Sequence, residues 1–431
     1  MDALTEKPRL RSLLDHFSTV TDPRHPWRVA HPLPEVLLLV VCATIASNDD
    51  YDDMVDWGET HLSFLRRFSE FHFGIPCADW LRTLMNRIDP DLFSVCFMAW
   101  VRDWWPETPD LIALDGKTSR RSHDRRAGQK ALHLVSAFAT HERLVLGQEA
   151  CEQKSNEITA IPVLLERLAA CGSLKGALIT IDAIACNPDI AQAIVEGGAD
   201  YLLAVKENQP TLHGEVAGFF ATARPDETET VVEVDKDHGR IETRRCVVSR
   251  QVDWLTGQRR FPGEARFPQL AAIAMIEAKV ELRDRCTFDR RFYIISTPLS
   301  AARCAAAVRG HWRIENSLHW VLDVVLREDL SRLRKGHGPR TWRSCATSPS
   351  TSCGGSPTNE ASSDAASAPD GTQPISHISS AYQPVNLDSL PWALTYVAAQ
   401  DRWLLVGVAG GCYDPRAPYA SNELDRPHVR A

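Results

Sequence analysis

The chain has 431 residues, of which 44% are hydrophobic and 24% are charged, a balance that excludes a wholly disordered protein. This length allows two or three domains and a sizeable hydrophobic core. The formal net charge is −8 and the sequence pI is about 6.0. Such a chain lacks the overall basic character that is typical of nucleic-acid-binding proteins, so a surface of that kind would have to be local.

The cysteines and the apolar runs bear on where the protein resides. The twelve cysteines are scattered without a CxxC pair, and no signal-peptide pattern is present. We therefore expect reduced thiols and a cytoplasmic location. The apolar run at residues 36–46 has eleven residues. A helix needs about 20 to span a bilayer, so the run predicts a buried helix and no membrane partner.

The first 105 residues predict a helical domain. Leu10, Leu13, Leu14 and Phe17 recur at the spacing of one helix face. Pro32 stands shortly before the apolar run at 36–46, where a proline commonly starts a helix. We expect helices to continue to about residue 105.

From about residue 106 the apolar pattern takes the period of strands. Five short apolar runs predict strands, at residues 111–114, 131–139, 144–151, 177–181 and 201–205. Helical patterns at 156–170 and after Pro188 separate the later strands. Three meandering strands followed by crossover helices indicate an α/β fold, with a mixed sheet and helices on its faces.

Two of these strands end in an aspartate. Asp115 follows the run at 111–114, and Asp182 follows the run at 177–181. If both strands are adjacent and parallel, the carboxylates emerge together at the edge where open α/β sheets bind ligands. A third acid, Glu315, lies in a helical pattern at 301–328. Such a set of three can hold two Mg²⁺ ions for phosphodiester chemistry, with Mn²⁺ as a substitute.

Each acid also has a simpler explanation that the sequence leaves open. Asp115 precedes a glycine, a common turn pairing, and Asp182 can cap the helix that follows it. Glu315 can be an exposed helix charge. His311 and His319 share a helix face with Glu315. No HExxH pattern accompanies these histidines, which argues against zinc.

Basic residues cluster beside two of the three acids. Residues 111–130 hold six Lys and Arg against two Asp and Glu, and residues 301–343 hold nine against four. These clusters can contact DNA phosphates, although solvated basic loops explain them equally well. Between them, residues 228–297 predict a β-rich insertion.

Several strings, taken in order, resemble the DDE transposases of bacterial insertion sequences, in the ISAs group. They are Ala113–Thr118, Lys154–Pro162, Thr180–Ala183, Asp200–Leu203, Lys206 with Asn208 and Gln209, His238–Glu242, and Trp312–Trp320 with Leu322–Val324. The resemblance implies a ribonuclease-H-like catalytic domain at 106–340 behind the helical domain at 1–105. It also implies a catalytic and metal-binding triad of Asp115, Asp182 and Glu315.

The function implied is that of a DNA transposase. Such an enzyme cleaves DNA at the element ends with divalent metal and transfers the freed strands into target DNA. Its partner is double-stranded DNA, and we expect a homodimer or larger assembly at the bacterial nucleoid. Three alternatives stay open: a catalytically impaired remnant that only binds DNA, a ribonuclease-H-like nuclease without transfer activity, and an α/β regulatory protein that does not act on DNA.

The basic stretches and the matched strings supply the candidate DNA contacts. They are Lys117, Arg120, Arg121, Lys154, Asn156, Lys206, His238, Arg240, Arg309, His311, Arg313 and His319. His311 and Leu322 stand where related transposases place arginine and lysine, and Arg309 and Arg313 are candidates to replace those charges. Trp312 and Trp320 are expected in the core rather than stacked on bases.

The composition breaks after Arg343. Residues 344–384 contain eleven serines and no Leu, Val, Phe, Trp, Met, Lys or Arg. Such a segment cannot bury enough apolar surface to order itself. Codons can be chosen for Thr341–Cys353 so that a neighbouring reading frame encodes an apolar helix like the last one of the family. We therefore expect residues 341–431 to be a frameshifted tail or a genuinely disordered one.

Overall fold

The computed structural model describes residues 9–353, except 47, 49, 125–127, 129, 152–156, 238–239, 257–265, 327, 332–333 and 335–336. Three of the expected DNA contacts, Lys154, Asn156 and His238, lie outside the described residues. Beyond Cys353, the expected tail also lies outside them.

The N-terminal part is helical, as the sequence predicts. Its helices are α1 (Arg9–Phe17), α2 (Leu33–Ile45), α3 (Tyr51–Thr60), α4 (Leu62–Leu65), α5 (Ala78–Met85) and α6 (Pro90–Trp104). Asp50 caps α3, because its Oδ1 accepts from the N–H groups of Asp52 and Asp53. Almost every residue of α2 is buried, as expected for the apolar run at 36–46. Across the described part of the chain, none of the helices combines the length and apolarity that a membrane span requires.

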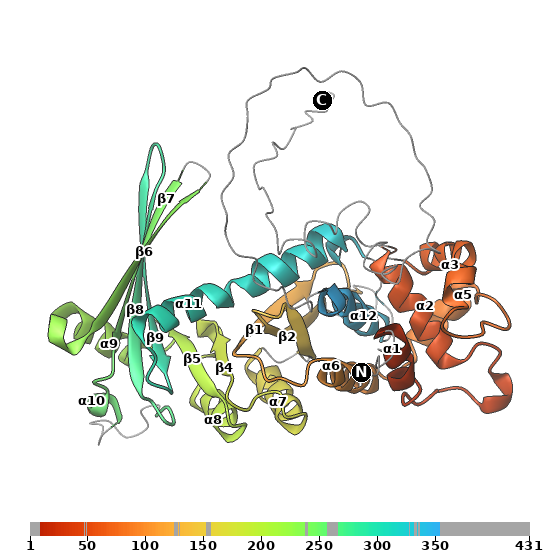
Figure 1. The fold of residues 1–431 in the computed structure, drawn as a ribbon, viewed down its shortest axis with the longest axis horizontal. Coiled ribbons are helices and arrows are strands. Elements are labelled where there is room, and N and C mark those ends of the chain that lie inside the picture. The colour runs from red at the N-terminus through yellow and green to blue at the C-terminus, as the bar shows by residue number, and fades with distance from the viewer. Residues whose placement is uncertain are drawn as a thin grey trace, which may run out of the picture. The chain divides into compact units, whose positions relative to one another are not determined.

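The central part holds the mixed sheet that the sequence predicts. Its first five strands are β1 (Leu111–Ser119), β2 (Leu132–Ala139), β3 (Leu144–Ala150), β4 (Leu178–Ile181) and β5 (Asp200–Val205). They lie in the order β3-β2-β1-β4-β5, with β1, β4 and β5 parallel and the two hairpin pairs antiparallel. Helices α7 (Glu157–Ala170) and α8 (Pro188–Glu196) cover one face (Figure 1). This arrangement confirms the ribonuclease-H-like α/β fold.

Strand β1 is longer than the apolar run that predicted it. The run ends at Leu114, but pairing with β2 continues from Asp115, opposite Ser136, to Ser119, opposite Leu132. The polar half of the strand was missed because only its first four residues are buried without interruption. Asp115 therefore lies within a strand rather than in a turn, and its backbone is held by the pairing with β2.

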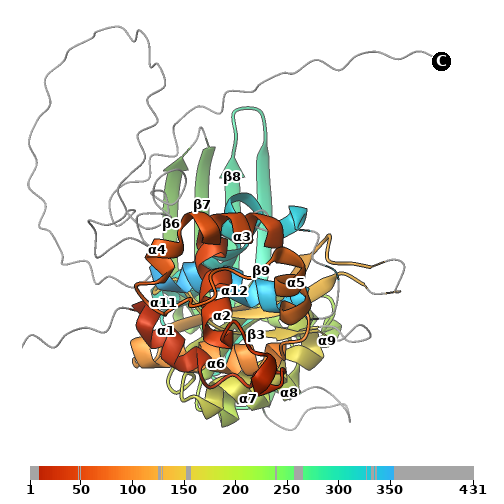
Figure 2. The same cartoon turned by 90° about the vertical axis from the view of Figure 1, so that its right-hand side faces the viewer.

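The β-rich insertion extends the same sheet. After α9 (Pro210–Thr222) come β6 (Glu229–Asp237), β7 (Arg240–Ser249), α10 (Asp253–Thr256), β8 (Ala272–Glu281) and β9 (Cys286–Ile295). Strand β9 pairs with β5, and β8, β7 and β6 follow outward, all antiparallel. The outer ends of these strands run well past the helices in both views (Figures 1 and 2).

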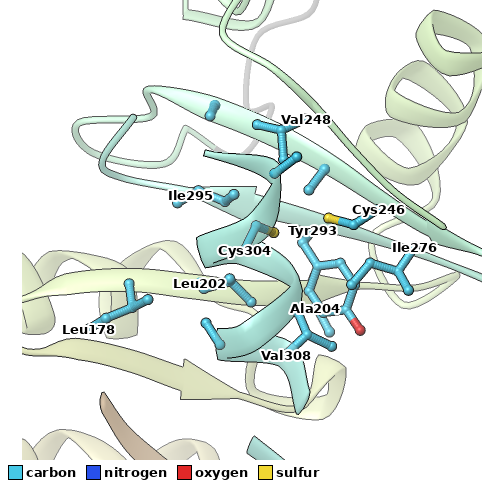
Figure 3. Close-up of a cluster of buried hydrophobic side chains, with 14 of the residues drawn as sticks. Leu178, Leu202, Ala204, Cys246, Val248, Ile276, Tyr293, Ile295, Cys304 and Val308 are labelled. Atoms are coloured by element: carbon cyan, nitrogen blue, oxygen red, sulfur yellow. The ribbon is translucent and has the colours of Figure 1, made fainter. Parts of the chain in front are cut away.

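Helix α11 (Ala301–His311) lies on the face opposite α7 and α8 (Figure 1). Cys304 and Val308 point from it into a buried cluster with side chains of β4, β5, β7, β8 and β9, among them Leu202 and Tyr293 (Figure 3). Gly310 makes its closest approach to the sheet, since an added Cβ would lie 2.3 Å from Leu111 Cδ2. The chain then continues as a π-helical turn over Ile314–His319.

Helix α12 (Gly338–Cys353) packs against α2, α6 and β3. The boundary expected at residue 340 thus falls inside a helix. Its Arg343, which is 1% exposed, forms an ion pair with the fully buried Glu328. Burial lowers the pKa of the Arg343 guanidinium to about 9, and its Nε and Nη2 have no hydrogen-bonding partner among the described residues. This pair joins α12 to the segment behind the π-helical turn.

The buried pair yields a stability prediction. Replacing Arg343 by methionine leaves the Glu328 carboxylate buried without a partner, which should lower the free energy of unfolding by about 3–5 kcal/mol. The double change Arg343→Met and Glu328→Leu should recover most of that loss, because no charge remains to be desolvated. Urea unfolding followed by circular dichroism measures both.

A surface pair is the matched control. Arg82 pairs with two exposed acids, Asp52 and Asp79, and the change Arg82→Met should lower the free energy of unfolding by less than about 1 kcal/mol. Equal losses for Arg82→Met and Arg343→Met would show that the buried pair does not anchor α12.

Candidate active site

Parallel pairing of β1 with β4 brings two aspartates together. Leu114 lies opposite Ile181 in the register, so the next residue along each strand is an acid, Asp115 in β1 and Asp182 after β4. Asp182 begins a short 3₁₀ turn, and its carboxylate accepts the N–H of Ala183 at 2.6 Å. The cap explanation for Asp182 therefore holds, but capping uses only one oxygen of a half-exposed carboxylate.

The third acid reaches the site from the π-helical turn. In this turn the N–H of Trp320 donates to the carbonyl of Glu315, five residues earlier. Such turns are rare and occur often at functional sites. Donor atoms of Asp115, Glu315 and His319 all lie within 4.8 Å of one another. The turn thus brings the side chains of Glu315 and His319 close to Asp115.

His319 is buried at the same place. It is 7% exposed, and its Nδ1 lies 3.5 Å from Oδ2 of Asp115. Burial, followed by the charges of Arg343, Lys117 and His311, lowers the pKa of His319 to about 3. The imidazole is therefore neutral at pH 7, and its contact with Asp115 is not an ion pair.

The carboxylate of Asp115 is strongly perturbed. Burial raises its pKa to about 7, and the negative charges of Glu157, Glu315 and Asp182 act in the same direction. The N–H of Gly116, donated to Oδ1 at 2.9 Å, only partly offsets this. Glu315 is itself exposed, but a largely buried carboxylate such as Asp115, surrounded by other acids, is a setting that a bound cation stabilises.

Glu157 is the acid that sequence reasoning did not place here. Thr118 Oγ1 lies 2.7 Å from His133 Nδ1, and His133 Nε2 lies 2.9 Å from Glu157 Oε1. An added Cβ on Gly116 would lie 2.1 Å from that same oxygen. The available signal was weak: a glutamate in the first turn of the helix that follows the third strand. Glu157 lies in Lys154–Pro162, one of the segments that resemble the transposases, but helix capping explained the presence of a glutamate there equally well.

The expected DNA contacts fall into two groups. The first group is exposed and consists of Arg120, Arg121, Lys206 and Arg240, although Arg120 Nε lies 3.5 Å from Asp329 and Arg240 Nη2 lies 3.9 Å from Glu242. Of these, Lys206 is closest to the acids, with Nζ 3.5 Å from Asp182 Oδ1. Others are held by the protein itself. Lys117 pairs with Asp323 at 2.7 Å, and Arg309 pairs with Asp235 at 2.7 Å.

The remaining candidates belong to the helix that carries Glu315. His311 is largely buried, with Nδ1 3.0 Å from Thr180 Oγ1, and its pKa is lowered by burial. Arg313 is exposed and donates to the carbonyl of Thr140 at 3.5 Å. His311, Glu315 and His319 were expected on one face. Glu315 and His319 meet at the cluster, whereas His311 turns to β4.

Two tryptophans differ from expectation. Trp312 is 43% exposed and Trp320 is 46% exposed, although we expected both in the core. Their indoles lie on the outer side of the helix because its inner side is taken by Ile314 and Leu318, which are fully buried. The guanidinium of Arg291 lies over the Trp312 ring, 5.0 Å from its centroid.

Comparisons with known proteins agree with this geometry. Residues 106–343 match the family described as "Transposase DDE domain", and residues 14–101 match the one described as "DDE_Tnp_1-associated". The chain is 39% identical over 331 residues to the H repeat-associated putative transposase YhhI of Escherichia coli (strain K12), which covers 76% of this chain and 86% of the relative. The putative transposase YncI of Escherichia coli O157:H7 is 39% identical over 335 residues, covering 76% and 83%.

A solved structure shows a more distant likeness. A chain from the piggyBac transposase synaptic complex with hairpin DNA aligns with a TM-score of 0.37 and 8% identity, over 81% of this chain and 72% of that one. The fold assignment rests instead on the strand order and directions of the sheet.

The close approach at Gly116 gives a prediction. Changing Gly116 to alanine should push Glu157 away from His133, because the new Cβ would lie 2.6 Å from His133 Nε2. We expect a displaced imidazole signal for His133 in NMR spectra of histidine-labelled protein, and a loss of about 1–3 kcal/mol in unfolding free energy. In contrast, Gly218→Ala adds a Cβ in open space. It should leave the His133 signal in place and should not lower the free energy of unfolding. An unchanged His133 signal in Gly116→Ala would contradict the packing described.

Proposed function

Because the chain belongs to the transposase DDE domain family, we propose that it cleaves DNA at the ends of a bacterial insertion sequence of the ISAs group and joins the freed 3′ ends to target DNA. One observation carries the proposal. Asp115 and Asp182 follow paired positions of β1 and β4, and a carboxylate oxygen of Glu315 lies close to one of Asp115. These are the three acids of the expected triad, brought together from distant parts of the chain.

The acids suit divalent magnesium. Carboxylate oxygens are the ligands that Mg²⁺ prefers, and few are needed because the ion keeps several waters. The close donor atoms of Asp115 and Glu315, and the absence of any described Lys or Arg paired with either, fit a cation held there. Asp115, Asp182 and Glu315 would hold two such ions, with Mn²⁺ as a substitute. Ions bound there would supply an attacking water of lowered pKa and positive charge beside the leaving 3′ oxygen.

The DNA partner is a double helix, first at the element ends and then at the target. Exposed Lys206, Arg313, Arg120 and Arg121 contact its phosphates close to the acids, and Arg240 does so at the outer strands. These residues are local exceptions in a chain of net charge −8, so binding should weaken steeply with salt. His311 orients the site through Thr180 rather than touching phosphate.

Assembly and location follow from the reaction. Joining two element ends requires at least two active sites, so the protein works as a homodimer or a larger assembly on DNA. The helical domain at 1–105 binds the ends or a second subunit, and the catalytic domain spans 106–340. The protein acts in the cytoplasm, at the nucleoid.

The unusual composition after Arg343 supports a frameshift near residue 340. Under this proposal residues 341–431 do not derive from the reading frame of the family. The alternative function, a remnant that binds DNA without cutting it, is favoured by the same observation. Sequencing the gene at the nucleotide level tests the frameshift. An adjacent frame that encodes an apolar helix after codon 340 supports it, and an adjacent frame full of stop codons excludes it.

The main prediction concerns the triad. Asp115→Asn, Asp182→Asn and Glu315→Gln should each lower cleavage of a duplex carrying the element ends by at least about 10²-fold, since an amide keeps the shape but offers no charge to a metal. Gel analysis of end-labelled DNA measures cleavage, and joining of the labelled strand to a plasmid measures transfer.

Controls separate the rival functions. Asp189→Asn, an exposed acid in the first turn of α8, should keep both activities. Cleavage without joining would identify a nuclease, and binding without cleavage would identify the impaired remnant. Retention of every activity in Asp182→Asn would exclude the transposase proposal.

A further inference from the structure

His319 is a nitrogen donor inside an oxygen site. Only 7% of the residue is exposed, and its Nδ1 lies 3.5 Å from Asp115 Oδ2. It belongs to the only group of three or more His, Cys, Asp or Glu among the described residues that could share one ion, together with Asp115 and Glu315. Asp182 is not part of that group. The three side chains best placed to share one ion therefore offer a ring nitrogen as well as carboxylate oxygens.

The backbone explains why the imidazole reaches this position. Glu315 and His319 are four residues apart in the π-helical turn, so both side chains emerge on the side that faces β1. Leu318 beside His319 is fully buried, which fixes the turn against the sheet. His319 is held in place by the packing of this turn and cannot swing into solvent.

Among the described residues, the His319 imidazole has no hydrogen-bonding partner that would compete with a metal ion. Its Nε2 is buried without a hydrogen-bonding partner among the described residues. Nearby cations are engaged elsewhere, since Lys117 pairs with Asp323 and Arg343 pairs with Glu328. In the described part of the chain, neither Asp115 nor Glu315 forms an ion pair with Lys or Arg. Glu315 is exposed, but the buried imidazole and the largely buried Asp115 carboxylate form an arrangement that costs stability unless a cation joins them.

We propose that His319 is a direct ligand of one of the divalent ions, held together with Asp115 and Glu315, and that this position takes Mn²⁺ in preference to Mg²⁺. The inference rests on the metal site of the proposed function and specifies its chemistry. Mg²⁺ favours oxygen donors, whereas imidazole nitrogen raises affinity along the first-row series that starts at Mn²⁺. The position formed with Asp182 would keep the ordinary preference for oxygen donors.

A spectroscopic test reads the ligand directly. Pulsed EPR of Mn²⁺ bound to the full-length protein should show coupling to one ¹⁴N nucleus, which changes to the ¹⁵N pattern when the histidines are ¹⁵N-labelled. In the His319→Gln variant the coupling should disappear. Mn²⁺ affinity, measured from the EPR signal of the free ion, should fall by about 10-fold or more, and Mg²⁺ affinity, measured by competition, should change less.

His61→Gln is the control, because His61 belongs to the N-terminal helical part, where its Nδ1 lies 2.9 Å from the carbonyl oxygen of Trp57. It should keep the nitrogen coupling and the Mn²⁺ affinity. The wild-type spectrum tests the inference even if a variant fails to fold. Bound Mn²⁺ without nitrogen coupling, or coupling that persists in His319→Gln, overturns the role of His319 and leaves the proposed function standing. Failure of the wild type to bind either ion overturns the metal site itself.

Discussion

The register between β1 and β4 is the constraint on which the site depends. Two apolar strands pair in parallel, and an aspartate directly follows the last paired residue of each, Leu114 and Ile181. A shift of one residue would turn one carboxylate to the other face of the sheet and separate the pair. Helix α11 must then come close enough to bring Glu315 over the strands. Gly310 permits this, since a side chain there would collide with Leu111.

Bringing the acids together disfavours the charged form of Asp115. The pKa of Asp115 is raised to about 7, first by burial and then by the neighbouring acids. Positive groups close by do not relieve this, because the protein pairs Lys117 with another acid and keeps His319 neutral. Glu157, held by His133 against Gly116, adds to the negative field. Lys206 Nζ lies 3.5 Å from Asp182 Oδ1, and the remaining negative charge around Asp115 supports the metal ions proposed above.

The β-rich insertion and α12 help to hold the segment that carries Glu315 in place. The insertion continues the sheet beyond β5 and supplies the surface of β7–β9 on which α11 packs (Figure 3). Behind the π-helical turn, α12 is joined through the buried Arg343–Glu328 pair. Several polar atoms of that region lack partners among the described residues, including Arg343 Nε and Asp323 Oδ1.

The sequence by itself determined the fold class and predicted the three acids, because strand and helix periods are local and the acids stand next to them. It could not give the full length of β1, whose polar half is fixed by pairing with β2. Nor could it show that His319 faces Asp115, or that Lys117 and Arg309 are engaged by acids of distant segments. Such pairings depend on which faces meet after folding, and spacing along the chain carries no record of them.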